Sequence, residues 1–413
     1  MRRLVDSVLP RRLGSDFRWL VGSSWATNLG DGIGIAAGPL LVESLTEDPL
    51  LVGLSWMLQR LPGLLLGLHA GVVVDRLDRR RVLIAANLAR VGVIMALAVA
   101  VFTDAATIGL VLAALFLLGV AETLADTTSL TLLPMIVAPG DLATGNTRLM
   151  FGFIGLDQLV GPSVGAALFV LGASVPFVGQ AVVLALGVVL TGRLRLGPVA
   201  APSERAGTVR ADIGDGLRWL RGHAAIRTLA ITITVFNLTF GAAYSVLVVL
   251  ATDRLGLGEI GFGLLTSITA VGGILGTLAY HRVEARIGMA AIMRIGLTVE
   301  VSTHLVLATV TTAWPAMVVL FCFGVHASMW GTTSNTIRQA AVPEHLQGRI
   351  AAVYGVGLKG GLVVGAGLGG LLASRGDITT PYWFAFVGSA VTLVLIWSSL
   401  GNIARESTAS GPR

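Results

Sequence analysis

Long apolar runs alternate with short charged or turn-rich stretches along the whole chain. A helix needs about 20 apolar residues to cross the hydrocarbon core of a bilayer, and the runs of this chain are of that length. We place predicted spans at residues 18–42, 50–74, 82–102, 106–128, 149–171, 174–194, 227–250, 260–281, 290–310, 313–335, 350–373 and 380–400. The pattern therefore predicts an all-α polytopic membrane protein with twelve transmembrane helices.

The longest polar stretch lies between the sixth and seventh predicted spans and divides the chain into two halves of six spans. We expect an N-terminal bundle over 1–195, a cytoplasmic linker over 196–225 and a C-terminal bundle over 226–413. Ile213, Leu217 and Leu220 recur at helical spacing within the linker. This spacing indicates a short amphipathic helix that lies on the membrane surface and tethers the halves.

The two halves match weakly at an offset of about 205 residues, which is how parallel transporter repeats appear in a sequence. The matches pair Asn28-Leu29 with Asn237-Leu238, Thr128-Ser129 with Thr333-Ser334, and 161–165 with 365–369. Two repeat-related bundles allow a central cavity that opens to alternate sides of the membrane.

Composition and charge further restrict the class of protein to which this chain can belong. Of the 413 residues, 54% are hydrophobic and 13% are charged, against about 25% charged residues in an average soluble domain. With the N-terminus placed inside, nearly all arginines fall in inner loops, which predicts a multi-pass protein of the cell membrane with both termini cytoplasmic. The net charge of +6 is then a topology signal and gives no support for a nucleic-acid partner.

The chain offers few groups for enzyme or metal chemistry. A single cysteine, Cys322, allows neither a disulfide framework nor a cysteine-based metal site, and the six histidines are scattered. The sequence has no His-Glu-x-x-His, nucleophile elbow or phosphate loop. We therefore expect no enzyme activity, no cofactor and no metal site.

Two motifs carry a family resemblance. The predicted loop from Gly71 to Arg81, which contains Asp75-Arg76 and Arg79-Arg80, resembles the signature of the major facilitator superfamily, with Asp78 where that family has glycine. Gly161-Pro162-x-x-Gly165 resembles the core of the superfamily's antiporter motif, with Asp157 and Ala166 at two of its other glycine positions. The loops 133–146 and 338–349 look like those of the enterobactin-exporter and macrolide-efflux branch.

The resemblance implies the major facilitator fold, proton-coupled efflux and specific roles for the motif residues. It implies a conformational latch formed by Gly71, Asp75, Arg76, Arg79 and Arg80, in which a charge-assisted contact breaks when the halves rock. It also implies that Gly161, Pro162 and Gly165 let a helix bend and pack closely.

Ionisable side chains inside a span are costly, so each is a functional candidate. The candidates for proton coupling are Asp31, Arg60, Glu122, Asp126 and Asp157. Asp31 and Arg60 both lie about 20 Å from the inner side by helix rise, so they could form an ion pair. Asp31 is then either the coupling carboxylate or one member of a fixed pair. Glu122 and Asp126 either bind a cationic group or pair with an inner arginine, and Asp157 is expected at a helix contact.

Other residues are candidates for packing or for a substrate cavity. Glu300 and His304 lie one turn apart and predict a local pair. Gly357, Gly361, Gly365 and Gly369 form a small face for tight helix packing. The expected cavity residues form an aromatic and amide mixture that suits an amphiphilic ligand: Trp25, Asn28, Asn237, Tyr244, His326, Trp330 and Lys359. The alternative for His326 is a hydrogen-bonded structural residue, which is the more common role of a lone histidine.

The favoured function is secondary active export of a small amphiphilic molecule, drug-like or siderophore-like, by proton antiport with alternating access. One alternative is export or import of an endogenous anionic metabolite or lipid, with Arg60 and Lys359 meeting the anionic group. The other is a transporter-like membrane sensor. The expected partners are the small-molecule substrate, protons and the lipid bilayer, and we expect a monomer.

Overall fold

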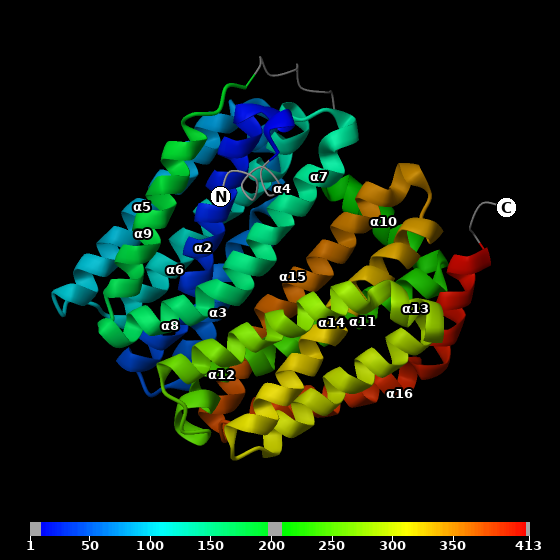
Figure 1. Ribbon diagram of the computed structural model, residues 1–413. Helices are drawn as coiled ribbons and strands as arrows, with labels where there is room; N and C mark the ends of the chain where they lie inside the picture. Colours follow the sequence, from blue (N-terminus) through cyan, green and yellow to red (C-terminus); the bar gives the residue numbers. More distant parts are fainter. Residues whose placement is uncertain (1–9, 197–208, 410–413) are drawn as a thin grey trace. The chain divides into compact units, whose positions relative to one another are not determined.

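The computed structural model describes residues 10–196 and 209–409, and the regular secondary structure within them is entirely helical (Figure 1). The first part of the chain forms η1 (Arg11–Leu13), α2 (Gly14–Leu45), α3 (Pro49–Leu65), α4 (Gly67–Arg76), α5 (Arg79–Phe102), α6 (Ile108–Ile136), η2 (Pro139–Asp141), α7 (Leu142–Phe151), η3 (Gly152–Val160), α8 (Gly161–Leu171) and α9 (Val175–Thr191). The second part forms α10 (Val209–Gly222), α11 (Ala224–Tyr244), α12 (Leu247–Val249), η4 (Leu250–Arg254), α13 (Glu259–Thr309), α14 (Ala313–Ala341), α15 (Glu344–Arg375) and α16 (Thr380–Ala409).

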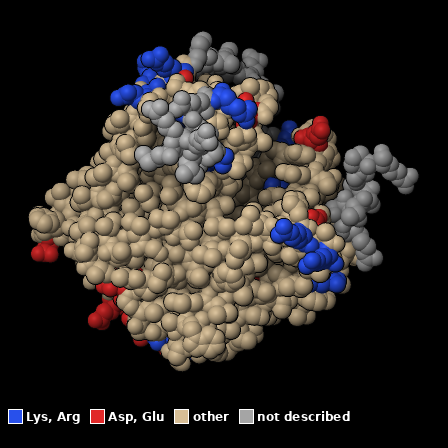
Figure 2. Space-filling model, viewed as in Figure 1, with Lys and Arg blue, Asp and Glu red and all other residues tan. Residues whose placement is uncertain are grey.

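Eight of the helices found among the described residues are long and apolar enough to cross a membrane. The predicted spans 260–281 and 290–310 both fall in α13, where Gly288 breaks the helical conformation with a φ of +75° and a ψ of 165°. The other ten predicted spans each overlap helical segments. On the face shown in Figure 2, charged side chains gather at helix ends and uncharged residues cover helix sides. The all-α membrane class predicted from the sequence is confirmed.

The chain folds into two compact units. Unit 1 comprises the described parts of Met1–Thr46, Leu58–Glu204 and Glu259–Ser267, and unit 2 comprises those of Glu47–Met57, Arg205–Gly258 and Ile268–Arg413. The junction between Glu204 and Arg205 lies outside the described residues, and the predicted domain bounds stay a prediction. The beginnings of α3 and α13 belong to a different unit from the rest of each helix: Ser267 of α13, for example, donates a hydrogen bond of 2.8 Å to the carbonyl oxygen of Leu159 in unit 1.

Close helix packing in unit 1 depends on the antiporter-like motif. The helix α2 packs against α8 and α9. A Cβ atom added to Gly32 would lie 2.5 Å from the carbonyl oxygen of Asp157 and 2.8 Å from the Cα of Gly161, and one on Gly165 would meet the backbone of Ile33. Only glycine permits this approach, so Gly161 and Gly165 fix how close α2 lies to α8.

In unit 2, glycines also allow close packing of the repeat-related helices, since α11 packs along the glycine face of α15. A Cβ on Gly361 would lie 2.5 Å from the carbonyl oxygen of Thr234, and one on Gly365 would lie 3.0 Å from the backbone nitrogen of Ala242. The packing role predicted for the α15 glycines is confirmed.

A π-helix, η3, precedes Pro162. Proline has no N–H to donate to the carbonyl of Gln158, so the regular α-helical bonding pattern is interrupted at this point. The N–H of Gly161 instead bonds to the carbonyl oxygen of Leu156, five residues back. The motif was predicted to let the helix bend. In the structure, the helix changes from π to α at this motif.

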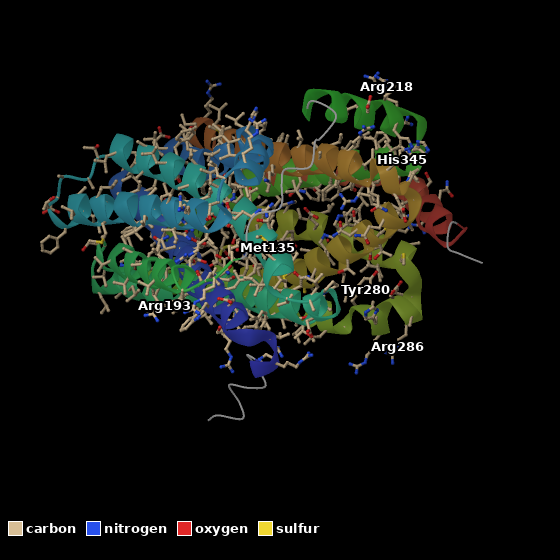
Figure 3. All side chains as sticks on the ribbon, turned by 90° about the horizontal axis from the view of Figure 1, so that it is seen from above. Met135, Arg193, Arg218, Tyr280, Arg286 and His345 are labelled. Atoms are coloured by element: carbon tan, nitrogen blue, oxygen red, sulfur yellow. The ribbon has the colours of Figure 1, made fainter. Side chains whose placement is uncertain are left out.

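The predicted linker helix is present as α10, which belongs to unit 2 and packs against α15. Asp215 of α10 forms an ion pair of 3.2 Å with Arg349 of α15, and Leu220 is buried in the hydrophobic core of unit 2. Leu217 stays 43% exposed, Arg218 points away from the helices (Figure 3), and the side chain of Ile213 lies outside the described residues. Part of the apolar face expected on the membrane surface is therefore covered by protein.

Candidate functional site

An ion pair joins α2 to α5 inside unit 1. Asp31 accepts a hydrogen bond from the guanidinium of Arg90, which also donates to the side-chain oxygen of Asn87 at 3.2 Å. The Arg90 side chain is 4% exposed, whereas that of Asp31 is 21% exposed. The arginine is thus enclosed by protein, and the carboxylate remains accessible.

This pair lines a cavity of about 60 Å³ in unit 1. The walls come from α2, α5, α6 and include Ser24, Asn28, Asp31, Arg90 and Asp126. The amide of Asn28 donates to the carbonyl oxygen of Ser24 at 2.7 Å, which leaves its own oxygen as an acceptor toward the cavity. The cavity therefore presents both charge signs and amide and hydroxyl groups to a polar ligand.

The structure pairs Asp31 with Arg90, whereas the comparison of depths along the helices suggested Arg60 as a possible partner. Helix rise gives depth along the membrane but not the direction in which a side chain points around the helix. Sequence reasoning missed Arg90, although it is the one charged residue in the predicted span 82–102. The rule that ionisable side chains inside a span are functional candidates selected Arg60, and the same rule would have selected Arg90.

Asp157 is the centre of a second charged group in unit 1. It is 6% exposed and accepts a hydrogen bond of 2.8 Å from the side chain of Gln158. The charges that act on it are those of Glu122 and Asp126 of α6 and of Arg60 of α3. As expected from its alignment with Gly161, Asp157 lies at a helix contact, beside Gly32. All five predicted coupling residues therefore lie in unit 1.

The signature loop is tied to unit 1 by its arginines. Arg79 donates to the sulfur of Met135 at 3.2 Å, and Arg80 donates to the backbone carbonyls of Thr191 and Gly192. Asp78 has a φ of −62° and caps the N-terminus of α5 by accepting from the N–H of Arg81 at 2.9 Å. Position 78, where the family has glycine, therefore has a backbone conformation that aspartate adopts without strain, and the aspartate caps the helix.

The remaining latch residues are Gly71, Arg76 and Asp75. A Cβ on Gly71 would meet no atom within 4 Å, and Arg76 is exposed at the end of α4. The side chain of Asp75 lies outside the described residues. The latch stays a prediction.

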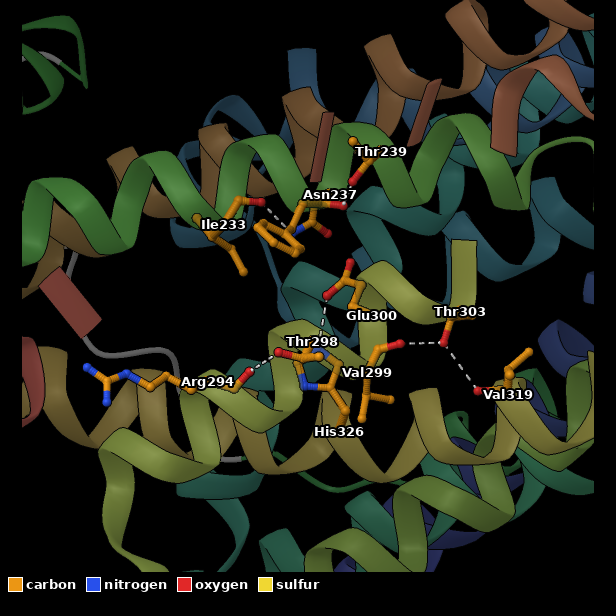
Figure 4. Close-up of polar contacts among 11 residues, drawn as sticks. Ile233, Asn237, Thr239, Arg294, Thr298, Val299, Glu300, Thr303, Val319 and His326 are labelled. Carbon is orange, nitrogen blue, oxygen red and sulfur yellow. Dashed lines mark hydrogen bonds and ion pairs between the residues drawn. The ribbon is translucent and has the colours of Figure 1, made fainter. Parts of the chain in front are cut away.

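A buried acid–histidine pair joins α13 to α14 in unit 2. His326 Nε2 lies 2.9 Å from a carboxylate oxygen of Glu300 (Figure 4), and the two side chains are 4% and 8% exposed. The predicted partner of Glu300, His304, is not its partner here. The interpretation of His326 as a hydrogen-bonded structural residue is confirmed.

The other predicted cavity residues are scattered. Trp25 donates to the carbonyl oxygen of Arg148 at 2.8 Å, Asn237 donates to that of Ile233 at 2.7 Å, and Trp330 is buried in the core of unit 2. Lys359 is exposed on α15. Asn28 lines the cavity of unit 1 and Tyr244 lines a smaller one in unit 2, while Trp25, Asn237, Trp330 and Lys359 line neither.

Among the described residues, no group of three or more His, Cys, Asp or Glu is placed to hold a metal ion.

The helical fold, the apolar spans, the signature loop and the ion pair between two spans all point to a membrane transporter. A family model described as "Transmembrane secretion effector", within the major facilitator superfamily, matches residues 10–408. The chain belongs to this family. It is a multi-pass membrane transporter of the major facilitator type and not an enzyme.

Curated members of the superfamily are similar over most of their length. The multidrug efflux pump Tap of Mycolicibacterium fortuitum is 29% identical over 355 residues, which cover 83% of this chain and 84% of Tap. An uncharacterized MFS-type transporter of Mycobacterium tuberculosis is 26% identical over 371 residues, which cover 82% of this chain and 80% of that protein.

Solved structures of other transporters share the fold of this family member. A bacterial homologue of the iron transporter ferroportin, in an inward-facing state, matches with a TM-score of 0.76 at 18% identity, over 94% of this chain and 99% of that one. The nucleoside transporter NupG matches with a TM-score of 0.70 at 14% identity, over 94% of this chain and 99% of that one. At these identities the likeness concerns the fold alone. It confirms the major facilitator fold expected from the motifs.

Proposed function

We propose that this transporter exports a small amphiphilic molecule across the cell membrane by proton antiport, with Asp31 as the coupling carboxylate. The observation that carries the proposal is the ion pair of Asp31 with Arg90 on the wall of a polar cavity. The similarity to Tap, whose name describes a multidrug efflux pump, favours export and a drug-like substrate.

The geometry supplies a simple coupling step. The carboxylate of Asp31 holds Arg90 by a charge-assisted hydrogen bond, and a proton on Asp31 removes that charge. Arg90 is enclosed and has Asn87 as a second acceptor, so protonation leaves its charge poorly compensated and favours a rearrangement of α2 against α5. The exposed fraction of Asp31 gives protons a path from the cavity to the carboxylate.

Substrate and proton then act in the same cavity. Asn28 and Ser24 lie on the wall that carries Asp31, so a bound molecule would lie beside the titrating group. Alternating access requires that proton release and substrate release occur on opposite sides. In this proposal both termini are cytoplasmic, and Asp75, Arg76, Arg79 and Arg80 form the inner latch.

Reconstitution tests both parts of the proposal. Proteoliposomes with an imposed pH gradient are assayed for flux of the cationic dye ethidium, of a neutral amphiphile and of an anionic one. Proton-driven flux of the cationic or neutral probe is expected, and a preference for the anionic probe would favour transport of an anionic metabolite.

The coupling residue is tested with Asp31→Asn. This variant is expected to lose accumulation driven by the pH gradient while it retains exchange of labelled for unlabelled substrate, because exchange needs no net proton movement. Asp253→Asn makes the same chemical change at an exposed position and serves as the matched control. Unchanged proton-driven flux in Asp31→Asn would remove Asp31 from the mechanism.

A further inference from the structure

Arg294 is a cation inside the predicted span 290–310 and belongs to unit 2. It is half-buried on α13, and its guanidinium lies over the indole of Trp397 in α16, with 5.3 Å between the guanidinium carbon and the ring centroid. Its Nη2 donates a hydrogen bond of 3.2 Å to the carbonyl oxygen of Trp397. The Nε–H of Arg294 is buried, so a molecule outside the protein reaches only the terminal N–H groups.

The described residues place no acidic partner beside Arg294. Glu300 is the one acid in the stretch 289–309 of α13, and its carboxylate is bonded to His326 at 2.9 Å. Figure 4 shows Arg294 pointing away from that pair. The stretch 380–403 of α16 has no charged residue. A guanidinium inside a span without a carboxylate is costly unless it reaches an anion or water at the membrane surface.

Arg294 and Trp397 lie near the ends of their spans. Arg294 follows Gly288, the break in α13, by six residues, which is about 9 Å at the rise of an α-helix. Trp397 precedes Ile403, where the apolar stretch of α16 ends, by six residues. Tryptophan is enriched at the membrane–water interface, and a long arginine side chain reaches the headgroups from this depth. In the predicted orientation this is the cytoplasmic leaflet.

Exposed apolar side chains continue from this pair toward the middle of the spans. Val394 lies one turn before Trp397 on the same face of α16 and is 76% exposed, and Leu395 is 75% exposed. Ile295, next to Arg294, is 55% exposed. The surface thus presents a cation and an indole at headgroup level and aliphatic side chains below them, which matches a phospholipid from its phosphate to its acyl chains.

We propose that Arg294 and Trp397 bind an anionic phospholipid of the cytoplasmic leaflet. The phosphate accepts charge-assisted hydrogen bonds from the terminal N–H groups of Arg294, the indole packs against the glycerol region, and an acyl chain follows Val394. A zwitterionic headgroup adds an ammonium, for which the described residues of this surface offer no carboxylate, so a headgroup without a positive charge is preferred. The site belongs to unit 2 and does not depend on proton coupling at Asp31.

The binding test uses native mass spectrometry of the purified full-length protein. Phosphatidylglycerol and phosphatidylcholine with identical acyl chains are compared. The wild type is expected to bind phosphatidylglycerol about five- to tenfold more tightly, the contribution of about one cation at a membrane surface. Glycerophosphate, which has the phosphate but no chains, should not compete. An absence of preference, as for an arginine that reaches only water, would overturn the proposal, and so would full competition by glycerophosphate, which would indicate a site for a free anion.

Matched variants separate this site from general attraction by positive charge. Arg294→Gln should lower the affinity for phosphatidylglycerol about fivefold and remove the preference over phosphatidylcholine. Arg286→Gln removes the same charge at an exposed position of the same helix and should lower that affinity less than about twofold. Arg294→Lys keeps the charge and should lose less than Arg294→Gln. Equal effects of Arg294→Gln and Arg286→Gln would contradict the assignment.

Crosslinking locates the lipid on the wild-type protein, so the proposal is decided even where a variant does not fold. A phosphatidylglycerol with a diazirine near the glycerol end of one acyl chain is photolysed in complex with the protein. Crosslinks are expected in peptides that contain Val394 or Ile295, and an excess of unmodified phosphatidylglycerol should suppress them. Crosslinks confined to other helices would place the lipid elsewhere and overturn the proposal.

Discussion

The ion pair of Asp31 with Arg90 predicts a measurable coupling energy between two helices. In Asp31→Asn the guanidinium of Arg90, which is 4% exposed, keeps its charge and retains the side-chain oxygen of Asn87 as an acceptor at 3.2 Å. A buried charge without its partner is strongly destabilising because the desolvation cost is no longer offset. The substitution should therefore lower the free energy of unfolding.

The size of the effect follows from the burial of the two partners. Breaking a fully buried pair costs about 3–5 kcal/mol, and a hydrogen bond to a charged group contributes about 1.5–3 kcal/mol. The Asp31 side chain is 21% exposed to the cavity, so water partly replaces the lost contact. We expect a loss of about 2 kcal/mol for Asp31→Asn. Arg90→Gln should cost less, about 1 kcal/mol, because the carboxylate left behind is solvated.

A double-mutant cycle isolates the pair. The free energy of unfolding is measured by SDS titration in mixed micelles for the wild type, Asp31→Asn, Arg90→Gln and the double variant. The effects should fall short of additivity by about 1.5 kcal/mol. Asp126→Asn, which makes the same change at an exposed side chain of the same cavity, should cost less than about 1 kcal/mol. A cycle that is additive within about 0.5 kcal/mol would refute the pairing.

Three further outcomes follow from packing, capping and titration. Gly361→Val should destabilise the protein by about 1–3 kcal/mol in the same assay, whereas Gly355→Val on the same helix, with no atom near its Cβ position, should have a much smaller effect; equal effects would contradict the α11–α15 packing. Asp78→Ala should cost about 1 kcal/mol through loss of the α5 cap, and Asp78→Gly only a few tenths; the reverse order would argue against a capping role. The hydrogen bond from the Thr379 N–H holds the pKa of Asp377 below its ordinary value of 3.8, so this group adds stability above pH 3.8. The small deficit of Asp377→Asn at pH 7 should vanish as the pH falls through the folded-state pKa, and a deficit that grows in acid would show the wrong sign.

Glu300 illustrates what local spacing cannot decide. Its one-turn separation from His304 predicted a pair within α13, because side chains four residues apart lie on one face of a helix. The carboxylate turns instead to His326 on the neighbouring helix α14, which leaves His304 at the wall of a cavity. A sequence shows which side chains share one face of a helix. The partner of each side chain depends on which other helix packs against that face.

The sequence by itself determined the helical membrane class, the glycine faces and the family. These features are local or periodic, because a span of apolar residues, a cap or a four-residue glycine repeat acts within one helix. The tertiary structure alone decided that Asp31 meets Arg90, 59 residues away, that α10 docks on α15, and that Arg294 of α13 lies over Trp397 of α16. Such contacts depend on the rotation and the mutual approach of separate helices, which are set by packing over the whole unit and are not written in any single segment.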